Sequence, residues 1–374
     1  MRILFNQTIP IINNYQRNNQ KNITNKGCEK TYFGTILPNI SNANFSNITF
    51  CRNQDAEFLL KQYKHLKCAY SGKLMLGRDE IKEIFQKLEK RPNAQAAINL
   101  LQSYERYMHE TEAMVFDLFK NAQYKNKRDF QDILIELQPE ALIRLKEKQI
   151  AILTSTDKII TKMSPAVAEL VKLIRDNALA KIEDNTFGRQ PPLEMIKSVK
   201  AKGNDLKRIR KIYQTWYKLP NSARDVDAFI VKYARRSHDE ISKRLISSSR
   251  ATIEHVIPIS RKKNDTLHNM ILVSARFNNE RHSMPLDEYI MLNDEIEIEK
   301  NLQKYIDSVI HEVGRKKSEF NDKGWYPNDI RTAINTETSG KVDLDITSLY
   351  LTKAQKKEAN APEKLIKKYS TKIS

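Results

Sequence analysis

Apolar residues follow two different spacings along the chain. From residue 79 to 248 they recur every three or four positions, which predicts amphipathic helices, and we expect four to seven of them packed as a bundle. An apolar, β-branched run over 252–257 and a short apolar run over 270–273 predict two strands joined by a polar loop. Ser274 is a typical N-cap residue, so a short helix is expected after the second strand. The pattern therefore predicts a mainly α-helical fold with a small strand–loop–strand–helix (ββα) unit.

The same spacing predicts individual elements elsewhere. Pro92 is expected to open one long helix that continues to about Leu118. An amphipathic helix over 286–313 is expected to lie behind the ββα unit. Residues 324–340 predict a loop, and the alternating stretch 343–350 predicts a short strand.

Shifts in composition divide the chain into five segments. The first 55 residues hold twelve Asn and few core-forming patterns, which is typical of a largely disordered arm. The turn at Ser71-Gly72 predicts a hairpin that belongs to the ββα core or, alternatively, an ordinary turn before a helix. The predicted segments are 1–55 (arm), 56–78 (hairpin), 79–248 (helical bundle, an insertion if the hairpin belongs to the core), 249–323 (ββα core with its backing helix) and 324–374 (loop and Lys-rich tail).

Charge and cysteine usage restrict the function classes. The chain holds 64 Lys and Arg against 46 Asp and Glu, a formal net charge of +18. This favours an anionic partner, and nucleic acid fits best, although A/T-rich genomes also encode Lys-rich proteins. Three scattered Cys give neither a zinc spacing nor a disulfide framework, so we expect a reducing, cytoplasmic setting, with a secreted effector as the alternative. No apolar run approaches the length of a membrane span, and the first twelve residues make a poor signal peptide.

The polar residues of the ββα unit are those that hydrolysis of a phosphodiester needs. Glu254 and Asn278 can supply oxygen ligands to a hard divalent ion. His255 titrates near neutrality and suits the deprotonation of an attacking water. His282 lies four positions after Asn278, so both would share one face of a helix. Asn269 could hold the imidazole in one orientation or tie the loop to the hairpin.

The spacing of these residues resembles that of HNH endonucleases, the ββα-metal or His-Me finger family. Glu254-His255 is followed by Pro258, by Asn269 fourteen residues after the His and by Asn278 twenty-three after it. The spacing is similar, without gaps, to the HNH domain of RNA-guided CRISPR nucleases. The resemblance implies a DNA endonuclease, with DNA favoured over RNA, in which His255 is the general base, Asn269 positions it, and Glu254 and Asn278 bind the metal ion.

Further site residues follow from the same resemblance or from the local run of cations. His282 falls where bacteriocin DNases of the family carry another metal-ligating His, and Arg281 is expected to contact a phosphate. Arg250, Arg261 and Lys262 flank the first strand and the loop and are expected to bind substrate.

Departures from the family pattern bear on the metal. The acid before the His is usually Asp, and Glu254 is one methylene longer. The Cys pairs that often brace this fold with zinc are missing, although Cys68–Lys73 resembles the turn that starts the preceding hairpin in many HNH proteins. Asn at 278 in place of His favours Mg²⁺, whereas binding by His282 would favour Mn²⁺, Ni²⁺ or Zn²⁺.

The helical region leaves two interpretations open. Residues 207–218 interleave cations with Tyr213, Trp216 and Tyr217, which could grip a nucleic-acid backbone and stack bases, or form an amphipathic helix with Ile209, Ile212 and Trp216 inward. Two further functions compete with the nuclease: a non-catalytic nucleic-acid-binding or scaffold protein with a degenerate HNH fold, and a nuclease toxin or defence effector whose helical region binds a protein partner.

Overall fold

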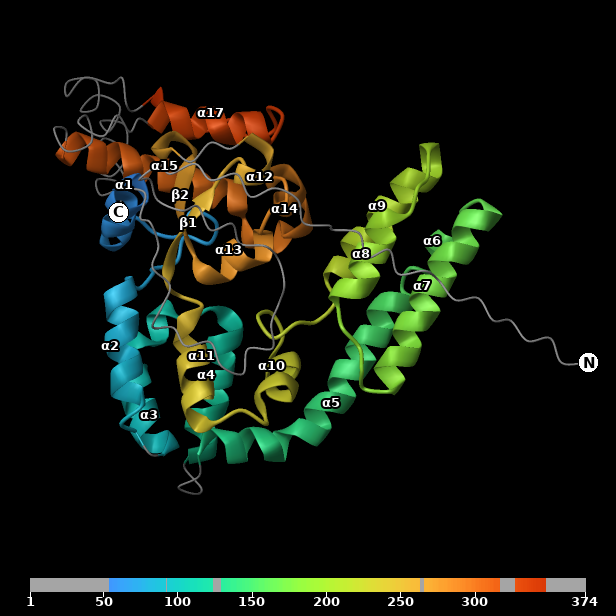
Figure 1. Ribbon diagram of the computed structural model, residues 1–374, viewed down its shortest axis with the longest axis horizontal. Helices are drawn as coiled ribbons and strands as arrows, with labels where there is room; N and C mark the ends of the chain where they lie inside the picture. The colour runs from blue at the N-terminus through green and yellow to red at the C-terminus, as the bar shows by residue number, and fades with distance from the viewer. Residues whose placement is uncertain (1–53, 92, 124–128, 263–265, 317–326, 348–374) are drawn as a thin grey trace, which may run out of the picture. The chain divides into compact units, whose positions relative to one another are not determined.

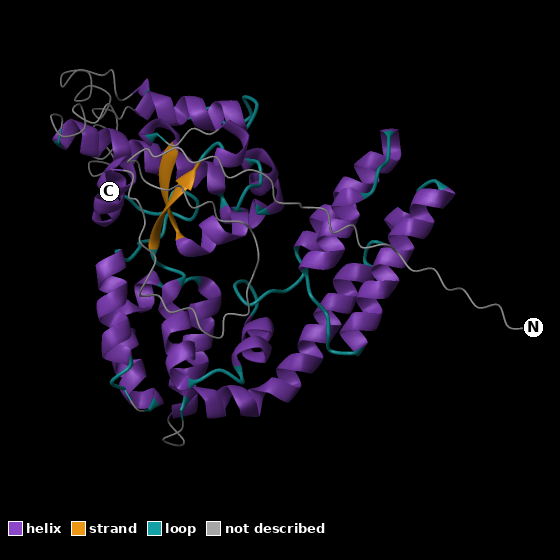
Figure 2. Cartoon of the chain, viewed as in Figure 1, coloured by secondary structure: helices purple, strands orange, loops and turns teal. Residues whose placement is uncertain are grey.

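The computed structural model describes residues 54–91, 93–123, 129–262, 266–316 and 327–347, and these are mainly helical (Figures 1 and 2). Most of the predicted Asn-rich arm and the Lys-rich tail lie outside these residues. Within them, a two-stranded sheet accompanies the helices, so the predicted fold class is confirmed.

The ββα unit has the predicted order. Strand β1 (Ala251–His255) pairs antiparallel with β2 (Met270–Ser274), and Glu254 lies opposite Ile271. Short helices α12 (Ile259–Lys262) and η3 (Leu267–Asn269) lie in the connection between the strands. Helix α13 (Ala275–Arg281) follows β2 directly, and Ser274 occupies its N-cap position, although its side chain makes no capping hydrogen bond.

The segment before the helical region packs on this unit as a helix and a turn, where the sequence left open a hairpin of the ββα core or an ordinary turn before a helix. It contains α1 (Gln54–Lys61), η1 (Gln62–Lys64) and a turn at Gly72, whose φ of +66° suits glycine. The Ala69 amide donates to the Leu272 carbonyl at 2.9 Å, and the Ser274 amide donates to the Cys68 sulfur at 3.4 Å. These bonds attach the turn to β2.

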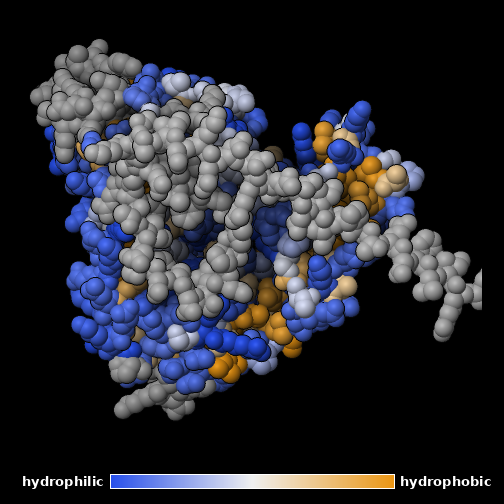
Figure 3. Space-filling model, viewed as in Figure 1, coloured by the Kyte–Doolittle hydropathy of each residue, from blue (hydrophilic) through white to orange (hydrophobic). Residues whose placement is uncertain are grey.

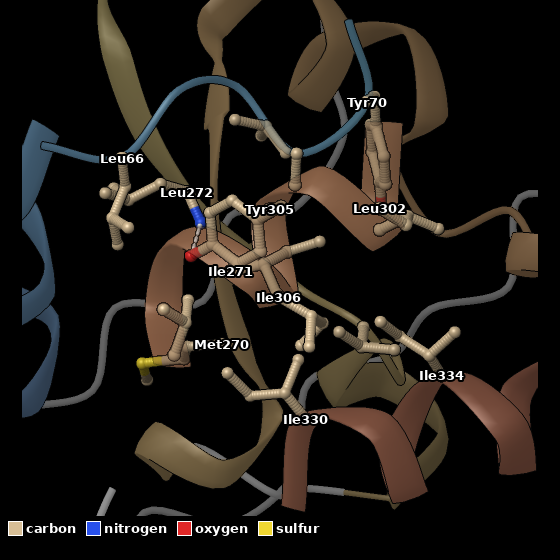
Figure 4. Close-up of a cluster of buried hydrophobic side chains, with 14 of the residues drawn as sticks. Leu66, Tyr70, Met270, Ile271, Leu272, Leu302, Tyr305, Ile306, Ile330 and Ile334 are labelled. Carbon is tan, nitrogen blue, oxygen red and sulfur yellow. Dashed lines mark hydrogen bonds between the residues drawn. The ribbon is translucent and has the colours of Figure 1, made fainter. Parts of the chain in front are cut away.

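One hydrophobic core joins this turn, both strands and the C-terminal helices (Figure 4). The helices are α14 (Leu286–Leu292), η4 (Asp294–Ile296), α15 (Ile298–Arg315) and α17 (Pro327–Glu337). The Tyr305 hydroxyl of α15 accepts the Leu272 amide at 3.0 Å within this core. Met270, Leu302 and Ile330 belong to its buried side chains.

Three predictions about the C-terminal part differ from the structure of the described residues. The single helix expected over 286–313 is broken near Glu297, whose backbone is left-handed with φ of 35°. The loop expected over 324–340 contains α17, which is stabilised by the burial of Ile330 and Ile334 in the core. No strand occurs over the described part of 343–350, residues 343–347.

The helical region leaves the core and returns to it at adjacent points. Leu76 forms a parallel bridge with Arg250: the Leu76 amide donates to the Ser249 carbonyl at 3.0 Å, and the Ala251 amide donates to the Leu76 carbonyl at 2.8 Å. Met75 and Ala251 are buried in the core of the strand pair, whereas Leu76 belongs to a separate helical core. This geometry supports the interpretation of the residues between them as an insertion.

Ten α-helices form the described part of this insertion, more than the four to seven predicted. They are α2 (Arg78–Leu88), α3 (Ala94–Leu101), α4 (Glu110–Gln123), α5 (Phe130–Thr154), α6 (Asp157–Ile160), α7 (Pro165–Glu183), α8 (Gln190–Ser198), α9 (Gly203–Tyr217), α10 (Val226–Tyr233) and α11 (His238–Ser247). The helix expected from Pro92 to Leu118 is interrupted by the 3₁₀ segment η2 (Gln102–Tyr107) and an extended Met108.

The insertion is built around two hydrophobic cores, where one bundle was predicted. The first joins α2, α3, α4, α10, α11 and the start of α5, and the second joins the end of α5 with α6 to α9. Helix α5 is long enough, at 25 residues, to serve both. Leu292 of α14 belongs to the second core, so that core also packs on the C-terminal helices. No helix among the described residues has the length and hydropathy to span a membrane.

Candidate functional site

Two side chains of α13 hold the edge of β1 that faces away from β2. Asn278 Nδ2 donates to the Ile253 carbonyl at 2.8 Å, and Arg281 Nη1 donates to the His255 carbonyl at 2.9 Å. The carbonyls of residues 253 and 255 point to the same edge of the strand, because they are two positions apart. Positions 278 and 281 are three apart and share one face of the helix. Pairing these groups stabilises an edge that would otherwise expose unsatisfied carbonyls, and it fixes α13 against the strand that carries Glu254 and His255.

Glu254 is buried with only one of its two oxygens bonded. The residue is 3% exposed, and Oε1 accepts from Arg281 Nη1 at 2.7 Å. Oε2 is also buried and has no hydrogen-bond partner among the described residues. Burial raises the pKa of Glu254 to about 8, and the charge and hydrogen bond of Arg281 only partly oppose this rise. An unpartnered carboxylate oxygen in the interior is costly, so this atom is suited to receive a ligand.

The structure does not support Arg281 as a phosphate contact. Its side chain is fully buried, and its donors are used within the protein. Besides Glu254 and the His255 carbonyl, Nη1 lies 3.0 Å from the Tyr70 hydroxyl, Nη2 donates to the Val256 carbonyl, and Nε donates to the Met284 carbonyl at 3.1 Å. A guanidinium engaged in this way organises the core and cannot reach substrate, because no donor faces solvent.

Asn269 takes the second of the two roles considered for it, tying the loop to the hairpin. Its Oδ1 accepts the Ile257 amide at 2.8 Å, and its Nδ2 donates to the Ile257 carbonyl at 2.7 Å. Its own carbonyl accepts the Val256 amide at 2.9 Å. The side chain therefore continues the antiparallel ladder by one residue pair and holds the backbone two residues after His255.

The three remaining residues of the predicted centre differ in exposure. His255 and Asn278 are half-buried, whereas His282 is exposed at the end of α13. His282 has a φ of 50°, and its Nδ1 lies 3.2 Å from the Ser283 hydroxyl. Within the described part of the chain, no three His, Cys, Asp or Glu side chains gather as a ligand set, so His282 does not join Glu254 and His255 in this conformation.

The expected substrate-binding cations are placed differently from one another. Arg261 forms an ion pair with Glu337 of α17, and the Glu337 carboxylate also lies 3.8 Å from Arg281. Arg261 therefore links α12 to the core. Arg250 is exposed, beside the point where the insertion returns to β1. Lys262 ends α12, and its side chain lies outside the described residues.

A second carboxylate with little exposure, Glu280 of α13, was missed by sequence reasoning. Arg224, from the connection before α10, donates to Glu280 through Nε at 3.2 Å and through Nη2 at 2.7 Å. Arg276 donates to the same carboxylate at 3.1 Å, and the Tyr289 hydroxyl lies 3.4 Å away. Burial acts to raise the pKa of Glu280, but the hydrogen bonds and charges of Arg224 and Arg276 outweigh it, so the pKa lies below its ordinary value.

This arrangement fastens the insertion to the helix that carries Asn278. The Arg276–Glu280 pair is visible in the sequence as an i, i+4 spacing, but Arg224 lies 56 residues away and no local pattern indicates it. His109, between η2 and α4, adds a second contact, because its ring lies edge-to-face on Phe277 at 5.3 Å between centroids. The geometry of α13 therefore depends on both the strand pair and the insertion.

Comparison with known proteins identifies the same part of the chain. Residues 237–284 match the family described as HNH endonuclease, and they run from the N-cap of α11 through β1, β2 and α13. No curated protein and no solved structure matches the chain. The matched residues include the acid-His pair on β1 and Asn278 on α13, so this segment is similar to HNH endonucleases.

Proposed function

We propose that this protein is a metal-dependent endonuclease that hydrolyses phosphodiester bonds in DNA, with His255 as general base and one divalent ion held by Glu254 and Asn278. The observation that carries the proposal is the buried, unpartnered Oε2 of Glu254, which lies on the residue directly before His255. A structural carboxylate is expected to have hydrogen-bond partners for both oxygens, and Oε2 of Glu254 has none among the described residues.

The donor atoms fit a hard cation. Asn278 uses its amide nitrogen on the Ile253 carbonyl, which leaves its carbonyl oxygen as the ligand atom. Carboxylate and amide oxygens of this kind suit Mg²⁺, and recruitment of His282 would shift the preference toward Mn²⁺, Ni²⁺ or Zn²⁺. When bound, the ion would supply stabilisation of the charge on the scissile phosphate and the leaving oxygen.

His255 performs the proton transfer in this proposal. Its backbone is fixed by Arg281, and its half-buried ring belongs to the same strand as Glu254. The imidazole takes a proton from water as the water oxygen bonds to phosphorus, the phosphorus–oxygen bond to the leaving nucleotide breaks, and solvent protonates the leaving oxygen. Asn269 supports the base indirectly, since it holds the backbone two residues after His255.

The choice of DNA over RNA rests on the resemblance to HNH endonucleases, and the net charge of +18 favours either polymer. A protein partner at the helical region belongs to the same proposal. Ile135, Ile143 and Ile150 are exposed residues of α5, and Figure 3 shows a hydrophobic area on the surface in this region. Such apolar exposure is typical of a surface that binds another protein, as a toxin, a defence effector or a scaffold would. A cytoplasmic setting is proposed from the low cysteine content.

One observation favours a second function, nucleic-acid binding without cleavage. Arg281 already neutralises Glu254 through a 2.7 Å ion pair, and an internal cation can stabilise the fold in place of a metal ion. In that case the HNH unit would act as a scaffold, and binding would be independent of divalent ions.

Cleavage of matched substrates separates the two functions. The purified chain with Mg²⁺ or Mn²⁺ is expected to nick supercoiled DNA, and His255→Ala is expected to slow cleavage by a factor of roughly 10² to 10⁴. His311→Ala is the matched control, because His311 is an exposed histidine on α15 away from the strands. An RNA of the same sequence tests the choice of polymer. Cleavage by His255→Ala at the parent rate, or binding with no cleavage in any metal, would reject the nuclease mechanism.

A further inference from the structure

Positive charge is concentrated in one part of the insertion. Residues 197–218 hold eight Lys or Arg and one acidic residue, Asp205. Helix α9 alone has a formal charge of +3, and no other helix among the described residues exceeds +2. The other described residues together carry slightly more acidic than basic side chains. Within the described chain, the basic character is therefore local to α8, α9 and their connection.

The cations of α9 occupy one exposed face. Lys207, Arg210 and Lys211 are exposed and lie within one side of the helix at i, i+3 and i+4. The opposite face is buried in the second helical core and holds Ile209, Ile212 and Trp216. The amphipathic interpretation of this helix is thus confirmed, and it leaves the charged face available to a partner.

These cations are not neutralised by neighbouring acids. Among the residues that the structure describes, no salt bridge within 4.0 Å involves Lys200, Lys207, Arg210 or Lys211, whereas Asp205 is already bonded to Arg208 and Ser164. Lysines at the two ends of the segment do have partners, and both partners lie in the C-terminal helices: Lys197 lies 3.1 Å from Glu288 of α14, and Lys218 lies 3.4 Å from Asp294 of η4.

The basic face is attached next to the candidate active site. Met284, two residues after His282, packs against both the core of the strand pair and the second helical core. Gln214 of α9 contacts Met291 of α14 at 2.9 Å. Helix α9 is therefore fastened to the segment that directly follows α13, so a strand bound at the site can continue onto it.

We propose that the exposed face of residues 197–218, with Lys200, Lys207, Arg210 and Lys211 at its centre, binds the phosphate backbone of the polynucleotide beside the scissile bond. The inference rests on the proposed nuclease function. A helix of this length extends about 22 Å, enough to follow several phosphates of one strand. Trp216 is buried and Lys197 covers Tyr213 at 5.5 Å, so this surface offers charge and not an aromatic ring for stacking. Contacts to phosphates carry no base information, so we expect binding here to be independent of sequence.

Salt-dependent binding tests this surface separately from catalysis. The full chain with His255→Ala, in EDTA, is titrated with a fluorescent duplex, with single-stranded DNA and with RNA at several salt concentrations. The triple variant K207Q/R210Q/K211Q is compared with K162Q/K172Q/K181Q, which removes the same charge from exposed lysines around α6 and α7. For three lost phosphate contacts on duplex, the slope of log K against log salt falls by about 2.7 in the α9 variant only. Circular dichroism establishes that both variants are folded.

Each outcome decides the proposal. An unchanged slope in the α9 variant, or an equal loss in both variants, overturns it. The proposal is also overturned if the α9 variant keeps nucleic-acid binding but loses binding to another anionic partner. The partners tested are vesicles with roughly 30% anionic lipid and an acidic polypeptide. Cleavage by the chain with intact His255 is measured in parallel. Absence of cleavage with a normal α9 effect rejects the nuclease function alone, whereas cleavage with no α9 effect rejects the surface alone.

Discussion

Helix α13 packs against one carboxylate, Glu254 of β1, and carries another, Glu280, and the two differ in how their oxygens are satisfied. On the strand side, Glu254 receives Arg281 on one oxygen, and its other oxygen has no described partner. On the insertion side, Glu280 has both oxygens bonded, by Arg224 and Arg276. The Glu254 side chain is 4% exposed and that of Glu280 is 12% exposed, yet the pKa of Glu254 is raised to about 8 and the pKa of Glu280 lies below its ordinary value. The number of donors around each carboxylate, and not its burial, separates a candidate ligand from a structural clamp.

The largest expected effect concerns the unsatisfied carboxylate. Glu254→Gln keeps an acceptor for Arg281 but removes the charged oxygen that a cation needs. We expect the rate of DNA cleavage to fall by at least about 100-fold, while the free energy of unfolding changes by less than about 1 kcal/mol. Cleavage and urea unfolding of the same preparation measure both quantities. A large loss of stability would show that Glu254 is a structural residue like Glu280.

The satisfied carboxylate predicts the opposite result. Arg224→Ala leaves Glu280 buried without its bidentate partner, and we expect a loss of about 4 kcal/mol in the free energy of unfolding. Arg235→Ala, on an exposed Arg of the same insertion, is the control and should change stability by less than about 0.5 kcal/mol. Equal unfolding free energies for the two variants would mean that the insertion does not hold α13.

A substitution of Asn269 tests how much its two hydrogen bonds to the Ile257 backbone stabilise the strand pair. Asn269→Ala leaves the buried amide and carbonyl of Ile257 without their side-chain partners, so we expect a loss of roughly 3 kcal/mol. Any fall in cleavage should then be recovered at low temperature, where the variant is folded. A variant with parent stability and no activity would instead support the direct catalytic role expected of Asn269 from the sequence.

Buried His109, in the insertion, is expected to make the free energy of unfolding depend on pH. Burial lowers the pKa of His109 to about 4, although the charge of Glu112 acts in the opposite direction. The neutral form is favoured in the folded state, so its stabilisation is complete above the unfolded pKa of about 6.5 and is lost as pH falls toward 4. Between pH 7 and pH 5 we expect a loss of about 2 kcal/mol that His109→Phe removes. Unfolding by urea at both pH values measures this difference, and an identical loss in the variant would contradict it.

The sequence predicted the local parts of this arrangement and missed the distant ones. The order β1, β2, α13 follows from apolar runs within about 35 residues, and the buried face of α9 follows from its helical spacing. The destination of Arg281 could not be predicted, because its partner Tyr70 lies 211 residues away along the chain and meets it through the turn that precedes the insertion. Arg224 was missed for the same reason.

Errors in the predicted elements have local causes. The helix over 286–313 breaks at a left-handed Glu297, a backbone conformation that a Glu does not indicate. Helix α17 was assigned to a loop because Gly and polar residues surround it, and it is stabilised by tertiary burial of Ile330 and Ile334. The division of the insertion into two cores depends on which helices meet, and apolar spacing alone does not specify this.

Binding of Mn²⁺ to the full chain, followed by electron paramagnetic resonance, tests the central contrast most directly. The parent is expected to bind one ion, Glu254→Gln to bind it at least about tenfold more weakly, and Glu280→Gln, where folded by circular dichroism, to bind it as the parent does. Parent-like affinity in Glu254→Gln would contradict the assignment of the unpartnered oxygen as a metal ligand.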